Sequence, residues 1–182
     1  GDAGHWYYRR FGRHDLRVTV IDVGSGNAAL LELPGGHTML IDGGGFTDNS
    51  VFDMGARVLA PLLWRKKIKT VDTLILTHPN SDHLNGLLYI AEHFNVQQIW
   101  TNGETRDTLG DCRLMDIIAA QNIQSPRFGS LPDRGLIHGV GINILYPQID
   151  FIKKKARDKW RNSNNNSLVI RISFGIVSFL FP

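Results

Sequence analysis

The feature of this sequence that most constrains its fold is the junction between an apolar run and a helical segment. Residues 71–76 are rich in β-forming side chains, which is typical of a buried strand, and residues 81–94 repeat apolar side chains at helical spacing. His78, Asp82 and His83 lie at this junction. A strand that leads directly into a helix is where an open α/β sheet usually keeps its ligand site. The sequence therefore predicts an α/β fold with a site at this strand end.

The side chains at this junction are those that bind metals. Imidazole and carboxylate groups are ligands that a borderline divalent ion such as zinc or manganese accepts. We expect His78, Asp82 and His83 to converge on one point, with Asp42 nearby. The alternative is that both histidines are hydrogen-bonded structural residues at a sheet edge. Two histidines and an aspartate on one loop favour the site over that alternative.

The junction is similar to a known motif. The metallo-β-lactamase superfamily carries His-x-His-x-Asp-His here, and the matching residues are His78, Asp82 and His83, with Asn80 in place of the second histidine. Within that superfamily, the chain resembles the C-terminal domain of the ComEC family, membrane proteins of bacterial DNA uptake. The segments that carry this resemblance are residues 22–24, 40–45, 77–86 and 166–171. The resemblance runs from about Leu16 to the end of the chain.

The resemblance implies an αββα sandwich that is a metal-dependent hydrolase, with zinc or manganese as the cofactor. Its metal ligands would be His78, Asn80, Asp82 and His83, and Asp42 would support them by hydrogen bonding the metal loop. A metal ion lowers the pKa of water, and Asp82 is the catalytic candidate that would orient the resulting hydroxide. The implied substrate is a DNA phosphodiester. For Asp42, a simple role as a turn or cap residue stays open.

Asn80 is the point at which the sequence departs from the motif. Its carbonyl oxygen suits a hard cation, but an amide brings no negative charge and ligates zinc poorly. This departure favours a second reading, in which the domain is a non-catalytic module that binds or guides single-stranded DNA and has a degenerate metal site. We expect the 182-residue chain to bind metal weakly or not at all. A third possibility is a small-molecule hydrolase, since the fold hosts those as well.

The two ends of the chain define the expected domain organisation. Residues 1–15 contain several aromatic residues and arginines and are interpreted as a linker or leader, and residues 16–182 as the domain. The chain stops on an apolar strand, which in the superfamily leads into a Gly-Asp metal ligand and a later histidine, so we expect a sandwich that is truncated at its C-terminal end.

The resemblance implies a bacterial inner or cell membrane protein, with this domain on the extracytoplasmic side. Its partners would be DNA, other competence proteins and a membrane-embedded channel portion of the same polypeptide.

The rest of the chain has ordinary globular composition, with 42% hydrophobic and 20% charged residues. Its single cysteine excludes an intrachain disulfide, and no apolar run is long enough to span a bilayer. Further strands are expected at residues 16–23, 28–33, 37–41, 96–100, 126–130, 136–138, 142–146, 168–173 and 176–181, and further helices at residues 51–67 and 107–120.

A basic stretch precedes the last two expected strands. Its candidate nucleic-acid-binding residues are Lys153, Lys154, Lys155, Arg157, Lys159, Trp160 and Arg161. Cations beside an aromatic ring suit a single strand, because the cations contact phosphates and the ring stacks on a base. The alternative is a solvated loop without a ligand.

Overall fold

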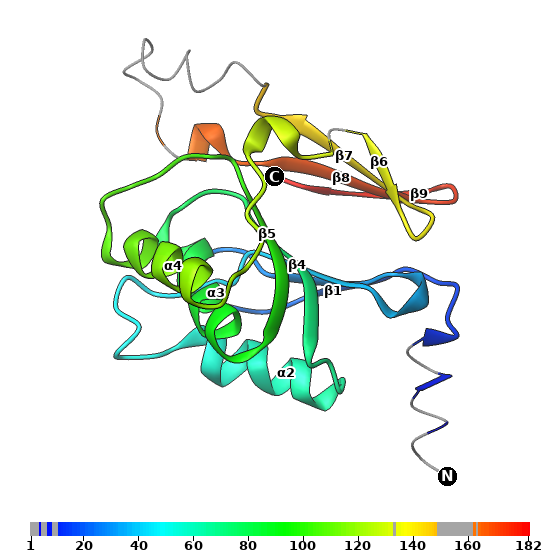
Figure 1. Cartoon of the computed structure of the whole chain (residues 1–182), viewed down its shortest axis with the longest axis horizontal. Coiled ribbons are helices and arrows are strands. Elements are labelled where there is room, and N and C mark those ends of the chain that lie inside the picture. The colour runs from blue at the N-terminus through cyan, green and yellow to red at the C-terminus, as the bar shows by residue number, and fades with distance from the viewer. Residues whose placement is uncertain (1–3, 5–6, 9–10, 133, 149–161, 163) are drawn as a thin grey trace.

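The architecture is that of two stacked β-sheets with helices on one side. The computed structural model describes residue 4, residues 7–8, 11–132, 134–148, residue 162 and residues 164–182. One sheet has five strands in the order β1-β2-β3-β4-β5, and the other has four in the order β6-β7-β8-β9. Figure 1 shows the four-stranded sheet above the five-stranded sheet, with the helices on the far side of the latter.

The five-stranded sheet combines a meander with two parallel strands. Its strands are β1 (Arg17–Val20), β2 (Ala29–Glu32), β3 (Thr38–Ile41), β4 (Thr70–Leu76) and β5 (Asn95–Thr101). β1, β2 and β3 pair antiparallel, whereas β3, β4 and β5 pair parallel. β3 and β4 are almost continuously buried because layers cover both faces of the sheet. Parallel pairing brings the carboxyl ends of β3, β4 and β5 to one edge.

The four-stranded sheet is wholly antiparallel. It consists of β6 (Gly135–Ile137), β7 (Val140–Tyr146), β8 (Val169–Phe174) and β9 (Val177–Phe181). Val140, Ile142, Ile170 and Ile172 face the first sheet and are fully buried. These side chains pack between the two sheets against Leu31, Met39 and Ile75, which lie on the facing side of the five-stranded sheet. The second sheet is therefore held by a core of its own between the layers.

Helices cover the other face of the five-stranded sheet. They are α2 (Ala60–Arg65), α3 (Ser81–His93) and α4 (Leu109–Ala120), and short turns lie at Pro34–Gly36, Phe128–Ser130 and Asn164–Asn166. Leu30, Leu40 and Leu74 from the sheet pack against Leu84, Leu87 and Ile90 from α3 in a second core cluster. The described residues thus form a helix–sheet–sheet sandwich. No helix among them is long and apolar enough to cross a membrane.

The helix expected over residues 51–67 begins later and is not uniform. A π-helical turn, η2 (Gly55–Leu59), runs directly into α2, in which Pro61 occupies the first turn. Proline has no N–H to donate to the carbonyl four residues earlier, so the hydrogen-bonding pattern changes to wider turns before it. Lys67, with φ of 55°, ends the segment.

Most of the predicted elements are confirmed to within a few residues, and one is wrong. The strand expected at 126–130 is instead the 3₁₀ turn η3, Phe128–Ser130, whose neighbour Leu131 is buried between the sheets. In that stretch Pro126 and Gly129 favour a turn over a strand.

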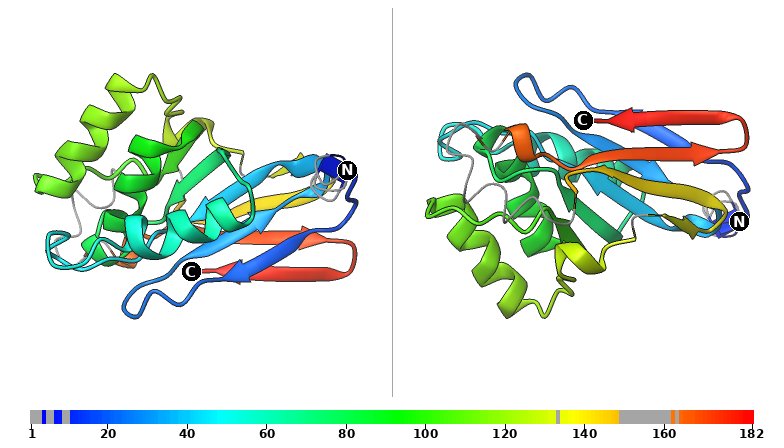
Figure 2. Two further views of the ribbon diagram at one scale, coloured as in Figure 1. Left: turned by 90° about the horizontal axis from the view of Figure 1, so that it is seen from below. Right: turned by 90° about the horizontal axis from the view of Figure 1, so that it is seen from above.

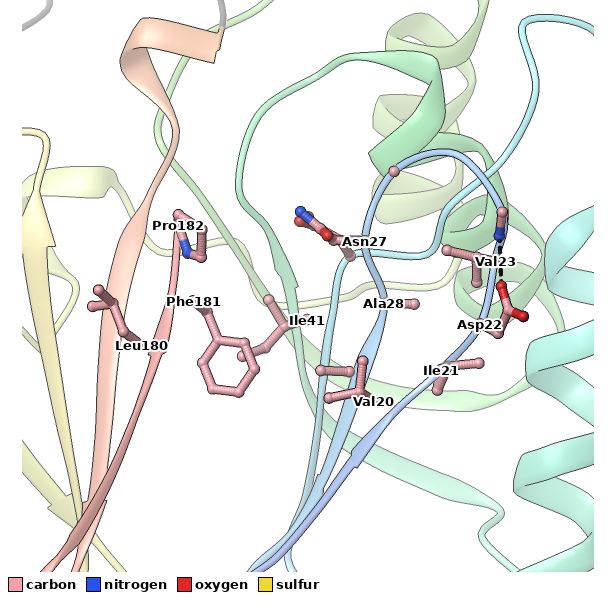
Figure 3. Close-up of a pocket in the computed structure, with 14 residues that line it drawn as sticks. Val20, Ile21, Asp22, Val23, Asn27, Ala28, Ile41, Leu180, Phe181 and Pro182 are labelled. Carbon is pink, nitrogen blue, oxygen red and sulfur yellow. Dashed lines mark hydrogen bonds between the residues drawn. The ribbon is translucent and has the colours of Figure 1, made fainter.

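β1 is one edge strand of the five-stranded sheet and β9 is one edge strand of the four-stranded sheet, and they lie along the same side of the sandwich in both views of Figure 2. Between them is a cleft of about 300 Å³ whose walls come from the β1–β2 hairpin and the end of β9. Figure 3 shows the Phe181 ring near Ile41 and Val20, with the Asn27 side chain at the other end of the cleft. The lining is mainly apolar, and Asp42, the carboxylate expected beside the metal loop, is one of its few polar members.

Candidate metal site

The candidate site lies where β4 ends and α3 begins. Thr77 to Asn80 form the connection, and Asn80 is the N-cap of α3 with extended backbone angles. Asp82 falls in the first turn of α3, where its charge suits the positive end of the helix dipole. His78 and His83 are buried residues, 4% and 8% exposed. The predicted strand, loop and helix therefore place both imidazoles at one edge of the sheet.

Asp42 lies at the centre of this arrangement. It follows β3, the strand beside β4, is 1% exposed and has a left-handed backbone with φ of 54°. Its carboxylate accepts three hydrogen bonds, from Thr77 N at 2.8 Å, Thr77 Oγ1 at 2.7 Å and His83 Nδ1 at 2.8 Å. A buried carboxylate needs such donors to offset the loss of water. Asp42 thus ties β3 to the loop and orients His83.

The proximity of Asp42 sets the protonation behaviour of His83. Burial alone would lower the pKa of His83, but the hydrogen bond and charge of Asp42, aided by the charge of Asp82, raise it above its ordinary value. The Nδ1–H of His83 points to a carboxylate oxygen, so in the neutral ring Nε2 carries the free lone pair. A buried carboxylate on Nδ1 is the usual support for a metal-binding imidazole.

His78 is held by two hydroxyl groups instead of a carboxylate. Its Nδ1 lies 3.1 Å from Thr77 Oγ1 and 3.1 Å from Ser167 Oγ. Thr77 Oγ1 donates its only proton to Asp42, and Ser167 Oγ donates its own to the carbonyl of Asn164 at 2.9 Å. Both oxygens must therefore accept from Nδ1–H of His78. Nε2 is again the unprotonated nitrogen, and burial lowers the pKa of His78, followed by the charge of His83.

The two imidazoles lie side by side. Their ring centroids are 4.0 Å apart, and Asp82 Oδ2 lies 4.0 Å from His83 Nε2. The Asp82 side chain is 39% exposed, so its carboxylate faces the open side of the site. The structure therefore brings His78, His83 and Asp42 into direct contact, with Asp82 at the margin.

Asn80 is engaged elsewhere. Its Oδ1 accepts a hydrogen bond from Arg106 Nη1 at 2.8 Å, and its Nδ2 donates to Asn164 Oδ1 at 2.6 Å. These bonds join the metal loop to the segment after β5 and to the turn before β8. The oxygen proposed as a metal ligand is thus occupied by a cation, which weighs against Asn80 as a ligand in this arrangement.

The side chains at the site have the chemistry of metal ligands, but too few of them converge to hold an ion. Two imidazoles with unprotonated Nε2 atoms and a neighbouring carboxylate fit zinc or manganese in their chemistry. However, no three His, Cys, Asp or Glu side chains within the described ranges lie close enough to hold an ion. The pair of histidines therefore fits part of a metal shell, and the rest of the shell is not assembled by the residues that the structure describes.

Close backbone packing fixes the position of the loop and helix. The glycines after β3 touch α3 directly, since Gly43 N donates to His83 O at 2.8 Å and Gly86 N donates to Gly44 O at 3.0 Å. A Cβ on Gly86 would collide with the carbonyl oxygen of Gly43, and one on Gly26 would collide with the carbonyl of Asp82. Glycine at these positions lets the first turn of α3 approach both β-segments.

Three residues near the site were not predicted from the sequence, namely Thr77, Ser167 and Arg106. Thr77 stands beside the motif, and Ser167 belongs to a segment noted only for its resemblance, so each had a weak local signal. Arg106 had none, because its contact with Asn80 depends on how β5 and α4 pack. A second cleft, of about 400 Å³, lies here between the first turns of α3 and α4 and includes Asn80, Asp82 and Arg106. The predicted DNA-binding residues 153–161 lie outside the described residues.

Comparison with known proteins gives the family of the chain. Residues 21–137, well over half of the chain, match the sequence profile of the Metallo-beta-lactamase superfamily. The chain belongs to the metallo-β-lactamase superfamily. The match includes β2 to β5 and the whole His78–His83 loop, so the strand, loop and helix that carry the candidate site lie within the matched region.

The chain is also similar to one curated protein and to several solved structures. The chain is 34% identical over 92 residues to ComE operon protein 3 of Bacillus subtilis (strain 168), a ComEC-family protein; the match includes 45% of this chain and 12% of that protein. A putative metallo-β-lactamase from Thermotoga maritima superposes with a TM-score of 0.52 at 13% identity, over 93% of this chain and 78% of that chain. The β-hydroxylase CmlA from Streptomyces venezuelae superposes with a TM-score of 0.48 at 15% identity, over 92% of this chain and 29% of that chain. The chain is thus a metallo-β-lactamase-fold domain with ComEC-like similarity.

Proposed function

We propose that this domain is a metal-dependent hydrolase of a ComEC-like DNA-uptake protein and that it cleaves a DNA phosphodiester. The observation that carries the proposal is the paired arrangement of His78 and His83, in which Nδ1 of each ring is committed to an oxygen and Nε2 is the unprotonated nitrogen of the neutral ring. Structural histidines at a sheet edge do not require this shared tautomer. A pair of imidazoles that binds one ion through both Nε2 atoms does require it, because the metal binds the nitrogen without a proton.

The residues around the pair have defined roles in this proposal. A divalent ion at His78, Asp82 and His83 would supply Lewis-acid activation of water and stabilise charge on the phosphate. Asp82 is the catalytic residue, because its half-exposed carboxylate beside His83 Nε2 would accept a proton of the attacking water and orient it. Asp42 holds His83 and, through Thr77, the start of the loop.

The second candidate function is a non-catalytic module that binds or guides single-stranded DNA. It is favoured by one observation, the engagement of Asn80 by Arg106 and Asn164 where the motif has a histidine. A side chain committed in this way contributes nothing to a metal shell. In this case the histidine pair would be a retained structural element, and binding of DNA would not depend on metal.

The cellular setting in the proposal follows from similarity to ComE operon protein 3, of which this chain spans only 12%. We expect the domain to belong to a bacterial membrane protein and to lie on its extracytoplasmic side. Its expected partners are single-stranded DNA, a membrane-embedded channel portion of the same polypeptide and other competence proteins.

Cleavage of a 5′-labelled single-stranded oligonucleotide tests the proposal. The protein is freed of metal and assayed with added manganese or zinc, alongside His83→Ala and the control His93→Ala, which changes an exposed histidine on the same helix. We expect cleavage only with metal, loss of cleavage in His83→Ala and retention in His93→Ala. Binding of the oligonucleotide without any cleavage at saturating metal would instead support the guiding module.

A further inference from the structure

Ser167 contacts the candidate site from the segment that leads into the second sheet. It lies between the 3₁₀ turn at Asn164–Asn166 and β8, 89 residues after His78, and its hydroxyl oxygen is 3.1 Å from His78 Nδ1. The neighbouring backbone is fixed to the site edge of the first sheet, because Leu168 N donates to Thr77 O at 2.9 Å and Asn102 Nδ2 donates to Asn166 O at 2.8 Å. This segment therefore cannot shift without moving the residues next to His78.

The direction of the Ser167 hydroxyl is determined by a second contact. Its proton is donated to the carbonyl oxygen of Asn164 at 2.9 Å, and a carbonyl oxygen can only accept. The serine oxygen is left as an acceptor toward His78. The other neighbour of Nδ1, Thr77 Oγ1, is likewise an acceptor because its proton goes to Asp42. Two acceptors facing one ring nitrogen require that nitrogen to carry the proton.

We propose that Ser167 is a positioning residue for His78: held by the carbonyl of Asn164, it accepts the Nδ1 proton and so keeps Nε2 unprotonated. The local sequence supplies one such acceptor, Thr77 Oγ1, whereas Ser167 is brought to His78 only when the second sheet packs on the first. Ser167 therefore makes part of the tautomer selection at His78 dependent on the docking of β8. A contribution of Ser167 to hydrolysis rests on the proposed function, but its effect on the tautomer of His78 does not.

The two histidines differ in the group that orients them. His83 has a buried carboxylate on Nδ1, whereas His78 has two neutral hydroxyl oxygens, each at 3.1 Å. A neutral acceptor does not favour a charged ring as a carboxylate does, so it selects a tautomer without promoting imidazolium. Removing one of two equal acceptors should weaken that selection without abolishing it, because Thr77 remains.

The experiment measures the ring nitrogens of His78 by long-range ¹H–¹⁵N correlation in metal-free, ¹⁵N-labelled protein, at alkaline pH where both rings are neutral. The unmodified protein should show His78 protonated on Nδ1. Ser167→Ala should raise the fraction protonated on Nε2, Ser167→Thr should restore the original pattern, and the exposed control Ser178→Ala should leave it unchanged. An unmodified protein with His78 protonated on Nε2 would overturn the proposal without any variant.

Zinc affinity provides the second readout. We expect Ser167→Ala to weaken zinc binding by about 10–100-fold, as for other groups that orient metal ligands, and Ser167→Thr to recover it. The Nδ1–H signal of His83 on Asp42 reports whether each variant keeps the folded site. Unchanged tautomer in Ser167→Ala would overturn the role of Ser167. The expected tautomers together with absent hydrolysis would leave Ser167 as a positioning residue and refute only the proposed function.

Discussion

His83 Nδ1 lies 2.8 Å from Asp42 Oδ2, and this buried contact joins the first turn of α3 to the end of β3. Because Asp42 also accepts two hydrogen bonds from Thr77, the same carboxylate orients a candidate metal ligand and fixes the loop that holds the other. An ionised carboxylate suits this position because all three neighbours are donors.

The first prediction concerns Asp42→Asn and pH. The pKa of His83 is raised in the folded protein, so its pair with Asp42 stabilises the fold fully below the unfolded value of about 6.5 and loses that effect as pH rises through the folded pKa. The destabilisation caused by Asp42→Asn should therefore be largest in mildly acidic solution and shrink in alkaline solution. About 1–3 kcal/mol should persist there, because the asparagine amide leaves a buried donor unpaired.

Urea unfolding of metal-free protein across this pH range measures the effect. Asp116→Asn, which changes an exposed carboxylate on α4, is the control and should give a difference that does not follow this trend. A loss of stability in Asp42→Asn that grows as pH increases would contradict the assigned direction of the His83 shift.

The second prediction restores the motif. Asn80→His should strengthen zinc binding by about tenfold or more, since an added imidazole ligand should matter at least as much as a supporting group. Arg106→Ala in the same protein should strengthen it further by removing a cation that contacts this position. Arg113→Ala is the matched control, because Arg113 is exposed on α4 and paired with Glu92 on α3. Competition with a chromophoric chelator measures affinity, and equal or weaker binding by Asn80→His would show that position 80 does not face the metal.

The third prediction tests the packing of α3 on the glycine loop. Gly86→Ala normally favours a helix, but here the added Cβ meets the carbonyl oxygen of Gly43. We expect a loss of about 3 kcal/mol or more in the free energy of unfolding, at the upper end for overpacked sites. Gly129→Ala, where the added carbon meets nothing within 4 Å, should change stability little. Similar stabilities for the two variants would mean that α3 does not approach the loop this closely.

The sequence predicted the features that depend on neighbouring residues and missed those that depend on contacts between distant segments. The strand, loop and helix around His78 and His83 follow from apolar periodicity over adjacent residues, and the role of Asp42 was expected from the resemblance to the metallo-β-lactamase superfamily. The contacts of Ser167 and Arg106 arise from pairings 89 and 26 residues apart, between segments with no shared local pattern. The π-helical turn before Pro61 likewise reflects a hydrogen bond that is missing from the ladder, which periodicity does not register.

The fourth prediction concerns the basic stretch, residues 153–161. If it binds a DNA backbone, Arg157→Ala combined with Arg161→Ala should lower the slope of log affinity against log salt by about 0.7 for each phosphate that the protein no longer neutralises. Trp160→Ala should weaken binding of single strands more than duplex, by about 1–3 kcal/mol per stacked base. Titration of labelled DNA at several salt concentrations measures both. Arg17→Ala with Arg113→Ala, two exposed arginines elsewhere, is the control. If the variants keep the wild-type slope of log affinity against log salt, the basic stretch does not bind DNA.

The central claim is that His78 and His83 present a pair of unprotonated Nε2 atoms to one divalent ion. Zinc titration of the ¹⁵N-labelled protein, followed at the ring nitrogens, tests it most directly. We predict that Nε2 of both histidines shifts together, that the change saturates at one ion per chain, and that dialysis reverses it, because the described residues do not complete the shell. Unchanged Nε2 signals at a large excess of zinc, or metal bound through Nδ1, would contradict the account.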